Sequence, residues 1–237
     1  MSLNDITYAG AMARWQPGAR ARLSEAALEL YDERGFEQTM VADIAERAGV
    51  TARTFFRHYA DKREVLFSGW SLLQGATASA LKEASADATA MELVQLALDA
   101  TAQLIGADQA RARRRQAIIA ATPELREREL IKYDALAHDL AQALHGHGID
   151  PVDAALAAHT GLAIYRVAFD QWTTTGSTDH PDETSETSET SGTGALTDLI
   201  ADATRRHQRL AEGNPTREHP GMTPPARRAD SDQGRSS

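Results

Sequence analysis

The chain has no cysteine among its 237 residues, and this absence excludes disulfide bonds and cysteine-ligated metal sites. The composition is therefore compatible with a reducing cytoplasm. Aromatic residues are also few, at 5%, whereas the helix-favouring residues alanine, leucine, arginine and glutamate are abundant. We therefore expect an all-α fold, in a chain long enough for one large or two modest domains.

Long hydrophobic runs are missing as well. The longest uncharged segment, residues 68–81, is short and interrupted by polar residues, so it does not predict a membrane span. Residues 1–20 lack the continuous apolar stretch of a secretory signal. The net charge is −9, which argues against nucleic-acid binding over the whole surface. We expect a cytoplasmic protein, without a membrane partner, whose contact with nucleic acid is confined to a local basic patch.

Residues 38–66 are the most informative segment. Apolar residues at helical spacing predict a short helix with Thr39 as its N-cap, and Gly49 ends this helix in the left-handed conformation that glycine adopts at little cost. Thr51 is the expected N-cap of a second short helix, on which Phe55 and Tyr59 face inward. Two short helices around a glycine turn are typical of a helix-turn-helix.

Charge favours a DNA-binding interpretation of this helix pair. Between Arg47 and Arg63 there are five cations and one anion, although the whole chain is acidic. A helix of this size fits the major groove of B-DNA, and arginine binds guanine edges or phosphates. The expected base-reading residues are Arg53, Thr54, Phe56 and Arg57, and the expected phosphate contacts are Thr39, Thr51, His58 and Lys62. The alternative is a helical hairpin that binds a protein partner, as in an adaptor with no affinity for DNA.

The segment from Arg20 to Leu66 resembles the N-terminal DNA-binding domain of the TetR family of bacterial transcription regulators. The matching pieces are Ala26-Ala27-Leu28-Glu29-Leu30-Tyr31, Gly35-Phe36, Thr39 to Ala45, Ala48 to Thr51, Phe55 to Tyr59 and Asp61-Lys62. The resemblance implies an N-terminal three-helix domain, a C-terminal helical domain for ligand binding and dimerisation, and a homodimeric repressor that a small ligand releases from double-stranded operator DNA. The family pattern has a tyrosine, typically a phosphate contact, where this chain has Phe56, which can instead contact a thymine methyl group.

The rest of the chain predicts further helices and flexible segments. The expected organisation is an arm at 1–16, a DNA-binding domain at 17–60, a regulatory and dimerisation domain at 61–211 and a disordered tail at 212–237. Residues 173–194 repeat Glu-Thr-Ser and are too polar to fold, so they are the expected linker within the regulatory domain. The helices expected in that domain are 61–82, capped by Asp61, and 91–105, 109–121, 123–144, 151–172 and 195–210.

Apolar residues in the C-terminal half predict a ligand pocket. Those at interior positions are Trp70, Met91, Val94, Leu98, Leu136, Leu140, Tyr165 and Phe169. A second resemblance, in Arg114-Arg115 and in residues 121–126 and 165–172, is to mycofactocin-regulator-like members of the family. It implies a small apolar, acyl-CoA-like ligand. The cluster of Arg111, Arg113, Arg114 and Arg115 is either a solvated face paired with carboxylates, a site for an anionic effector, or a contact between domains. For an acyl-CoA ligand, the expected phosphate contacts are Arg113, Arg114 and Arg115.

The segment 151–172 is apolar nearly all round, and such a helix must be covered on both sides. We expect it to pair, together with the helix 195–210, with its copies across a two-fold axis. Leu162 and Leu199 are the residues expected in this homodimer interface.

Other chemistry has little support in the sequence. The candidate metal ligands are His138, His145, His147, Asp150 and His159, but the His-Gly-His-Gly stretch is interpreted as a polar loop between helices. A glycine-rich phosphate loop, a nucleophile elbow and a helical His-Glu-x-x-His are all missing. We therefore expect no enzyme activity, no catalytic residue, no cofactor and no metal.

Overall fold

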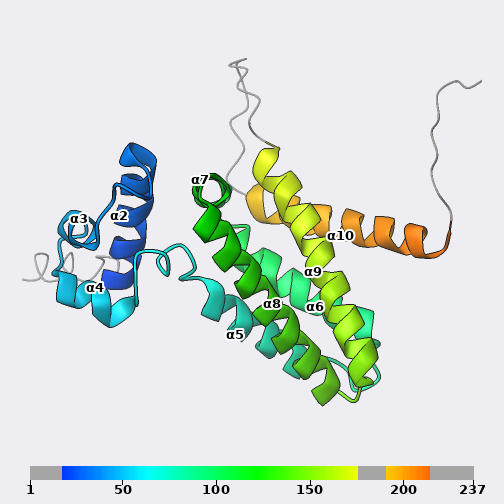
Figure 1. Cartoon of the computed structure of the whole chain (residues 1–237). Helices are drawn as coiled ribbons and strands as arrows, with labels where there is room; N and C mark the ends of the chain where they lie inside the picture. Colours follow the sequence, from blue (N-terminus) through cyan, green and yellow to red (C-terminus); the bar gives the residue numbers. More distant parts are fainter. Residues whose placement is uncertain (1–17, 176–190, 214–237) are drawn as a thin grey trace, which may run out of the picture.

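The computed structural model describes residues 18–175 and 191–213, and within these residues it contains nine helices and no strand (Figure 1). The expected all-α fold is confirmed. The predicted arm 1–16, most of the linker 173–194 and most of the tail 212–237 lie outside the described residues. The ends of the predicted linker are helical, because one helix continues to Thr174 and the next begins at Ser191.

The N-terminal domain is built from α2 (Ala19–Arg34), α3 (Val41–Arg47) and α4 (Ala52–His58). These three helices form a separate group in Figure 1. Their core is made of fully buried side chains from each helix: Leu23, Leu30, Ile44 and Phe55. Gly35 and Gly49 end α2 and α3 with positive φ angles of 83° and 66°, a conformation that glycine adopts without a Cβ clash.

The chain between Asp61 and Gly69 forms tight turns, which corrects the predicted helix 61–82. Its backbone hydrogen bonds join residues three apart, as from the Leu66 N–H to the Arg63 carbonyl. Asp61 still caps the start of this segment, because its carboxylate accepts hydrogen bonds from the N–H groups at positions 63 and 64. Serine and glycine at 68 and 69 disfavour a helix interior, and α5 (Trp70–Lys82) begins only after them.

Five further helices complete the regulatory domain. They are α6 (Ala90–Ile105), α7 (Gln109–Ala121), α8 (Pro123–Gly146), α9 (Pro151–Thr174) and α10 (Ser191–Ala211). Proline starts α8 and α9, where its missing N–H is not needed. At the start of α6, Thr89 and Glu92 cap each other reciprocally. The predicted boundaries of these helices are therefore confirmed to within a few residues.

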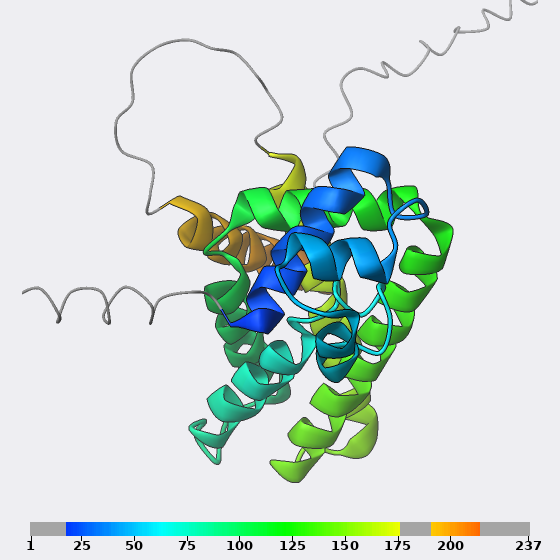
Figure 2. The ribbon, with the colours of Figure 1, turned by 90° about the vertical axis from the view of Figure 1, so that its left-hand side faces the viewer.

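Two hydrophobic cores hold the molecule together. The core of the regulatory domain gathers residues of α6, α8, α9 and α10, including the fully buried Trp172. The N-terminal core extends beyond the boundary expected at residue 60. It takes in Val65, Leu66 and Phe67 from the turns and Ile118, Ile119 and Leu125 from the junction of α7 with α8. The N-terminal domain is thus seated over α7 and the start of α8 (Figure 2).

Candidate functional site

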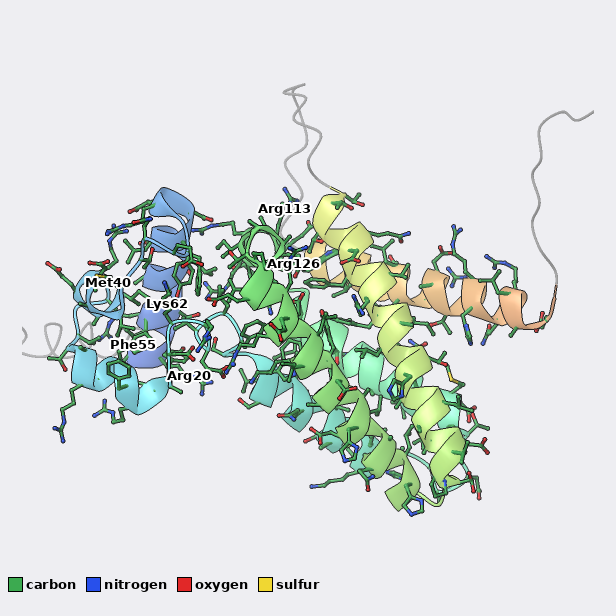
Figure 3. The ribbon with its side chains drawn as sticks, in the orientation of Figure 1. Arg20, Met40, Phe55, Lys62, Arg113 and Arg126 are labelled. Carbon is green, nitrogen blue, oxygen red and sulfur yellow. The ribbon has the colours of Figure 1, made fainter. Side chains whose placement is uncertain are left out.

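Helix α4 is held by one face and exposes the other. The Thr51 hydroxyl accepts a hydrogen bond from the Thr54 N–H at 3.2 Å, which confirms Thr51 as the N-cap. Phe55 is fully buried and Tyr59 is nearly so, as predicted, and the Tyr59 hydroxyl donates to the Arg20 carbonyl at 3.1 Å (Figure 3). The helix is therefore fixed to the domain by its inner face, so its outer face can be presented to a partner.

The outer face of α4 carries the predicted base-reading residues. Arg53 and Arg57 are exposed, and neither forms a hydrogen bond or an ion pair with any residue in the described part of the chain. Phe56 lies between them in sequence with 58% of its surface exposed. Thr54 is half-buried, and its hydroxyl lies 3.1 Å from the Thr51 hydroxyl. Two free guanidinium groups and one exposed ring thus share a face that is open to the major groove of DNA.

Other cations of this region are already paired. Arg47 forms ion pairs with Glu29 and Glu33 at 3.1 and 2.8 Å. Arg63 pairs with Asp61 at 2.7 Å. The positive charge available for DNA is therefore smaller than the sequence suggests, and it is concentrated on α4.

Lys62 does not present its ammonium to solvent as a predicted phosphate contact would. Its Nζ atom donates to the carbonyls of Phe36 at 2.8 Å, Thr39 at 3.1 Å and Glu37 at 3.3 Å. It also lies 4.3 Å from the centroid of the Phe36 ring. An ammonium has three donors, and all three are used here. Lys62 therefore has a structural role within the domain, and its contact with the DNA backbone stays a prediction (Figure 3).

Thr39 is also placed differently from the prediction. Its side chain is only 1% exposed, and its hydroxyl donates to the Gly35 carbonyl at 2.9 Å, so it neither caps α3 nor reaches a phosphate. The N-cap is Met40, whose N–H donates to the Asp43 carboxylate at 2.9 Å. The side chain of Met40 is exposed, with 67% of its surface accessible. The sequence did not predict this, because the N-cap was expected one residue earlier, at Thr39. His58, the other predicted phosphate contact, is half-buried.

Two of the cavities in the described residues are lined by residues predicted for the ligand pocket. The larger, of about 290 Å³, opens where the N-terminal domain meets α5, α7 and α9, and Trp70, Tyr165 and Phe169 line it as predicted. The smaller, of about 40 Å³, lies between α5, α6, α8 and α9. Among its lining residues are the predicted Leu98, Leu136 and Leu140.

Two predicted pocket residues, Met91 and Val94, line neither cavity. Val94 packs against Gly161, where an added Cβ would lie 2.5 Å from the Val94 Cγ1 atom. The close approach of α6 to α9 explains why Val94 is buried without facing a cavity.

The arginines of α7 contact the N-terminal domain. Arg114 pairs with Asp32 at 2.6 Å, and Arg115 donates to the Leu66 carbonyl at 2.6 Å. Arg111, of the same predicted cluster, pairs with Glu25 and donates to the Ser24 hydroxyl. Of the three interpretations of this arginine cluster, these contacts favour a contact between the two domains. Arg113 is half-buried on the same helix (Figure 3).

An apolar stripe on α9 is left exposed. Val152, Leu156 and Val167 have 67%, 63% and 52% of their surface accessible. Leu162 and Leu199, the residues predicted at a dimer interface, are instead half-buried against the core of their own domain. A face of α9 is therefore uncovered in the single chain, but its outermost residues differ from those predicted.

The histidines considered as metal ligands make local contacts. The Nδ1 atoms of His145 and His159 lie 3.0 and 2.8 Å from the carbonyls of Ile149 and Ala155. Within residues 18–175 and 191–213, no cluster of three or more histidine or acidic side chains could hold a metal ion. None of the helices in those ranges is long and apolar enough to cross a membrane.

Comparison with known proteins identifies both parts of the chain. Residues 23–68 match the family of bacterial regulatory proteins of the tetR family, and residues 88–195 match the MftR C-terminal domain. A relative named as the mycofactocin biosynthesis transcriptional regulator MftR of Mycobacterium tuberculosis is 27% identical over 154 residues, which are 63% of this chain and 77% of that protein.

Two further similarities concern the DNA-binding domain and the fold. The HTH-type transcriptional regulator TcmR of Streptomyces glaucescens is 44% identical over 63 residues, which are 27% of this chain and 28% of that protein. A crystal structure of a TetR-family transcriptional regulator from Syntrophomonas wolfei superimposes with a TM-score of 0.56 and 16% identity, over 84% of this chain and 98% of that one. The helix-turn-helix, the helical domain behind it and these matches agree, and the chain belongs to the TetR family of DNA-binding transcriptional regulators.

Proposed function

We propose that the protein is a homodimeric repressor that binds operator DNA through α4 and leaves it when a small apolar ligand binds the regulatory domain. The observation that carries the proposal is the pair of unpaired guanidinium groups of Arg53 and Arg57 on a helix whose opposite face is buried. Buried Phe55 fixes the orientation of this helix, so the two arginines need no rearrangement before they meet DNA.

The spacing of these arginines fits base reading. Four residues of α-helix span about 6 Å along the axis, and successive base pairs are about 3.4 Å apart. Arg53 and Arg57 can therefore address base pairs within one half-site, each through a bidentate contact with a guanine. Phe56 lies next to Arg57 and offers an apolar surface to a thymine methyl group. Phosphate contacts remain proposed for Thr51 and His58.

The exposed stripe on α9 supports a dimer. Val152, Leu156 and Val167 lie on one face of α9, and exposed apolar side chains that share a face mark a contact surface more often than single ones do. Pairing of α9 and α10 with their copies would cover this stripe and relate two α4 helices by a two-fold axis. A palindromic operator with half-sites about 34–36 Å apart fits such a dimer.

The cavity at the junction of the two domains supports the proposal of a small-molecule ligand. Its volume of about 290 Å³ is at the lower end of the range for small-molecule sites. A whole acyl-CoA is far larger, so only an acyl chain or a compact apolar molecule fits within it. A ligand between the two domains would change the position of α4, because the turns at 61–69 join α4 directly to the cavity wall.

A band-shift titration with the DNA upstream of the protein's own coding sequence tests the proposal. We expect a retarded complex whose affinity falls steeply between about 50 and 200 mM salt, since several phosphates are neutralised in such complexes. A footprint of two equal half-sites would support the dimer. Absence of any salt-dependent complex with duplex DNA would contradict the proposal.

A further inference from the structure

The larger cavity takes its walls from both domains at once. Leu28 of α2 and residues 65–68 of the turns face it from the N-terminal side. Trp70 of α5, Tyr133 of α8 and Phe169 of α9 face it from the regulatory side. A molecule bound here would therefore touch the DNA-binding domain directly.

Aromatic side chains are gathered along this cavity, although they are only 5% of the chain. They form a continuous series of ring contacts from the turns to Phe169 on α9. The ring centroids are 6.2 Å apart for Phe67–Trp70, 5.2 Å for Trp70–Tyr133, 6.3 Å for Tyr133–Tyr165 and 5.5 Å for Tyr165–Phe169. Such a wall favours a flat ring, which can stack on it or meet it edge to face.

Two hydroxyl groups in this wall have no partner in the described part of the protein. Tyr133 and Tyr165 are 7% and 6% exposed, both line the cavity, and neither hydroxyl forms a hydrogen bond with residues 18–175 or 191–213. Burial raises the pKa of both phenols well above the ordinary value, so both stay protonated and can donate. Neither hydroxyl oxygen is among the fully enclosed side-chain atoms that lack a partner, so each keeps some accessible surface and a ligand oxygen in the cavity can accept a hydrogen bond from it.

The two arginines that line the cavity are already paired with carboxylates. Arg111 lines it but is paired with Glu25, and Arg115 lines it but is 3.4 Å from the carboxylate of Glu129. Asp108 adds a further negative charge at the rim. An anionic ligand would have to displace one of these carboxylates, whereas a neutral ligand would leave both ion pairs in place.

We propose that the junction cavity binds a neutral, flat aromatic molecule of two or three fused rings that carries a hydroxyl or carbonyl oxygen. Its rings would lie among Trp70, Tyr133 and Phe169, and its oxygen would hydrogen-bond to the hydroxyl of Tyr133 or Tyr165. The size follows from the volume, which equals that of about ten water molecules in the liquid. The inference rests on the proposed function, because it names the ligand class of the same regulatory domain.

Equilibrium dialysis of the full chain with 2-naphthol and with naphthalene tests the proposal. We expect both to bind, 2-naphthol more tightly. Tyr133→Phe and Tyr165→Phe keep the rings, and at least one of them should weaken 2-naphthol about threefold to tenfold while leaving naphthalene unchanged. Tyr31→Phe is the matched control, since its hydroxyl donates to the Lys62 carbonyl and lies outside the cavity.

A blocking variant tests the location independently. Leu104 lines the cavity with 42% of its surface exposed, so Leu104→Trp should fill the space without disturbing a buried core position. It should abolish binding of both probes. Failure of both probes to bind the wild type would overturn the proposal, and so would binding that neither tyrosine variant nor Leu104→Trp alters.

Two competing ligands complete the test. Tighter binding of 2-naphthoate or of lauroyl-CoA than of 2-naphthol would overturn the choice of a neutral aromatic ligand. DNA binding of the unliganded protein is measured separately. A protein that binds 2-naphthol as expected but no DNA would contradict the proposed function and leave the cavity assignment standing.

Discussion

Lys62 joins three backbone carbonyls that lie between α2 and α3. Hydrogen bonds that involve a charged group contribute about 1.5–3 kcal/mol each when their partners are well placed. Because the Lys62 ammonium also lies over the Phe36 ring, its removal leaves carbonyl groups and an aromatic face without a partner.

Replacing Lys62 with Met keeps the apolar stem and removes these bonds. We expect the free energy of unfolding to fall by about 1–3 kcal/mol, measured by urea denaturation of the full chain. Arg57→Met is the control, because Arg57 is exposed and should leave stability unchanged within about 0.5 kcal/mol. Unchanged stability of Lys62→Met, together with weaker binding to every DNA sequence, would instead support the phosphate role.

Asp61 makes the stability of the N-terminal domain depend on pH. Burial by itself would raise the pKa of this carboxyl, but hydrogen bonds from the Arg63 side chain and from two backbone N–H groups outweigh it and hold the pKa below its ordinary value. Since the folded state has the lower pKa, the stabilisation is fully present above the unfolded-state pKa of about 4 and is lost as the pH falls through the folded-state value.

Asp61→Asn removes the charge and keeps the shape. The amide oxygen can still accept the backbone hydrogen bonds, but the ion pair with Arg63 is lost, so we expect the free energy of unfolding to fall by up to about 1 kcal/mol near neutral pH. The difference from the wild type should shrink as the pH is lowered towards about 3, because the wild-type carboxylate then becomes protonated. Urea unfolding at several pH values measures this, and a difference that stays constant with pH would contradict it.

At the scale of elements, α7 is attached to the N-terminal domain in two ways. Its ion pairs through Arg111 and Arg114 are about a third to a half exposed, and such pairs contribute about 0–1 kcal/mol. Its apolar residue Ile119 is fully buried in the N-terminal core. Truncation of a buried isoleucine costs about 2–5 kcal/mol, so the apolar contact should dominate.

Ile119→Ala should therefore destabilise the protein several times more than Arg114→Ala. Urea unfolding followed by tryptophan fluorescence measures both. An equal or larger effect of Arg114→Ala would show that the ion pairs, rather than the apolar contact, hold the two domains together.

Local signals in the sequence predicted most elements correctly. Helical spacing, the Thr51 cap, Gly49, and proline at 123 and 151 are all effects of neighbouring residues, and the helices follow them closely. The turns at 61–69 were missed because an apolar pattern there does not distinguish an α-helix from turns with bonds three residues apart.

Long-range partners could not be predicted in the same way. The sequence shows that Arg114 and Lys62 are cations, but it does not show that Asp32 or the Phe36 carbonyl lies beside them. Helical periodicity alone predicts which face of α4 is exposed. Arg53 and Arg57 lie on that face, so they remain candidates for contacts with DNA.

At the scale of the whole molecule, the α9 stripe predicts a dimer. Leu156→Glu places a charge in the middle of the stripe and should yield monomers that no longer bind operator DNA. Leu130→Glu is the matched control, since Leu130 on α8 is similarly exposed, at 53%, and lies outside the stripe. Sedimentation velocity measures the mass of each variant, and a Leu156→Glu protein that remains dimeric would place the interface elsewhere.

A fluorescence-anisotropy titration of operator DNA with wild type and with Arg53→Ala tests whether α4 reads operator DNA through its free arginines. We predict that Arg53→Ala weakens operator binding by about 1–3 kcal/mol and relaxes the preference at one base pair in each half-site, with the fold unchanged. Wild-type affinity and unchanged sequence preference in Arg53→Ala would contradict the account.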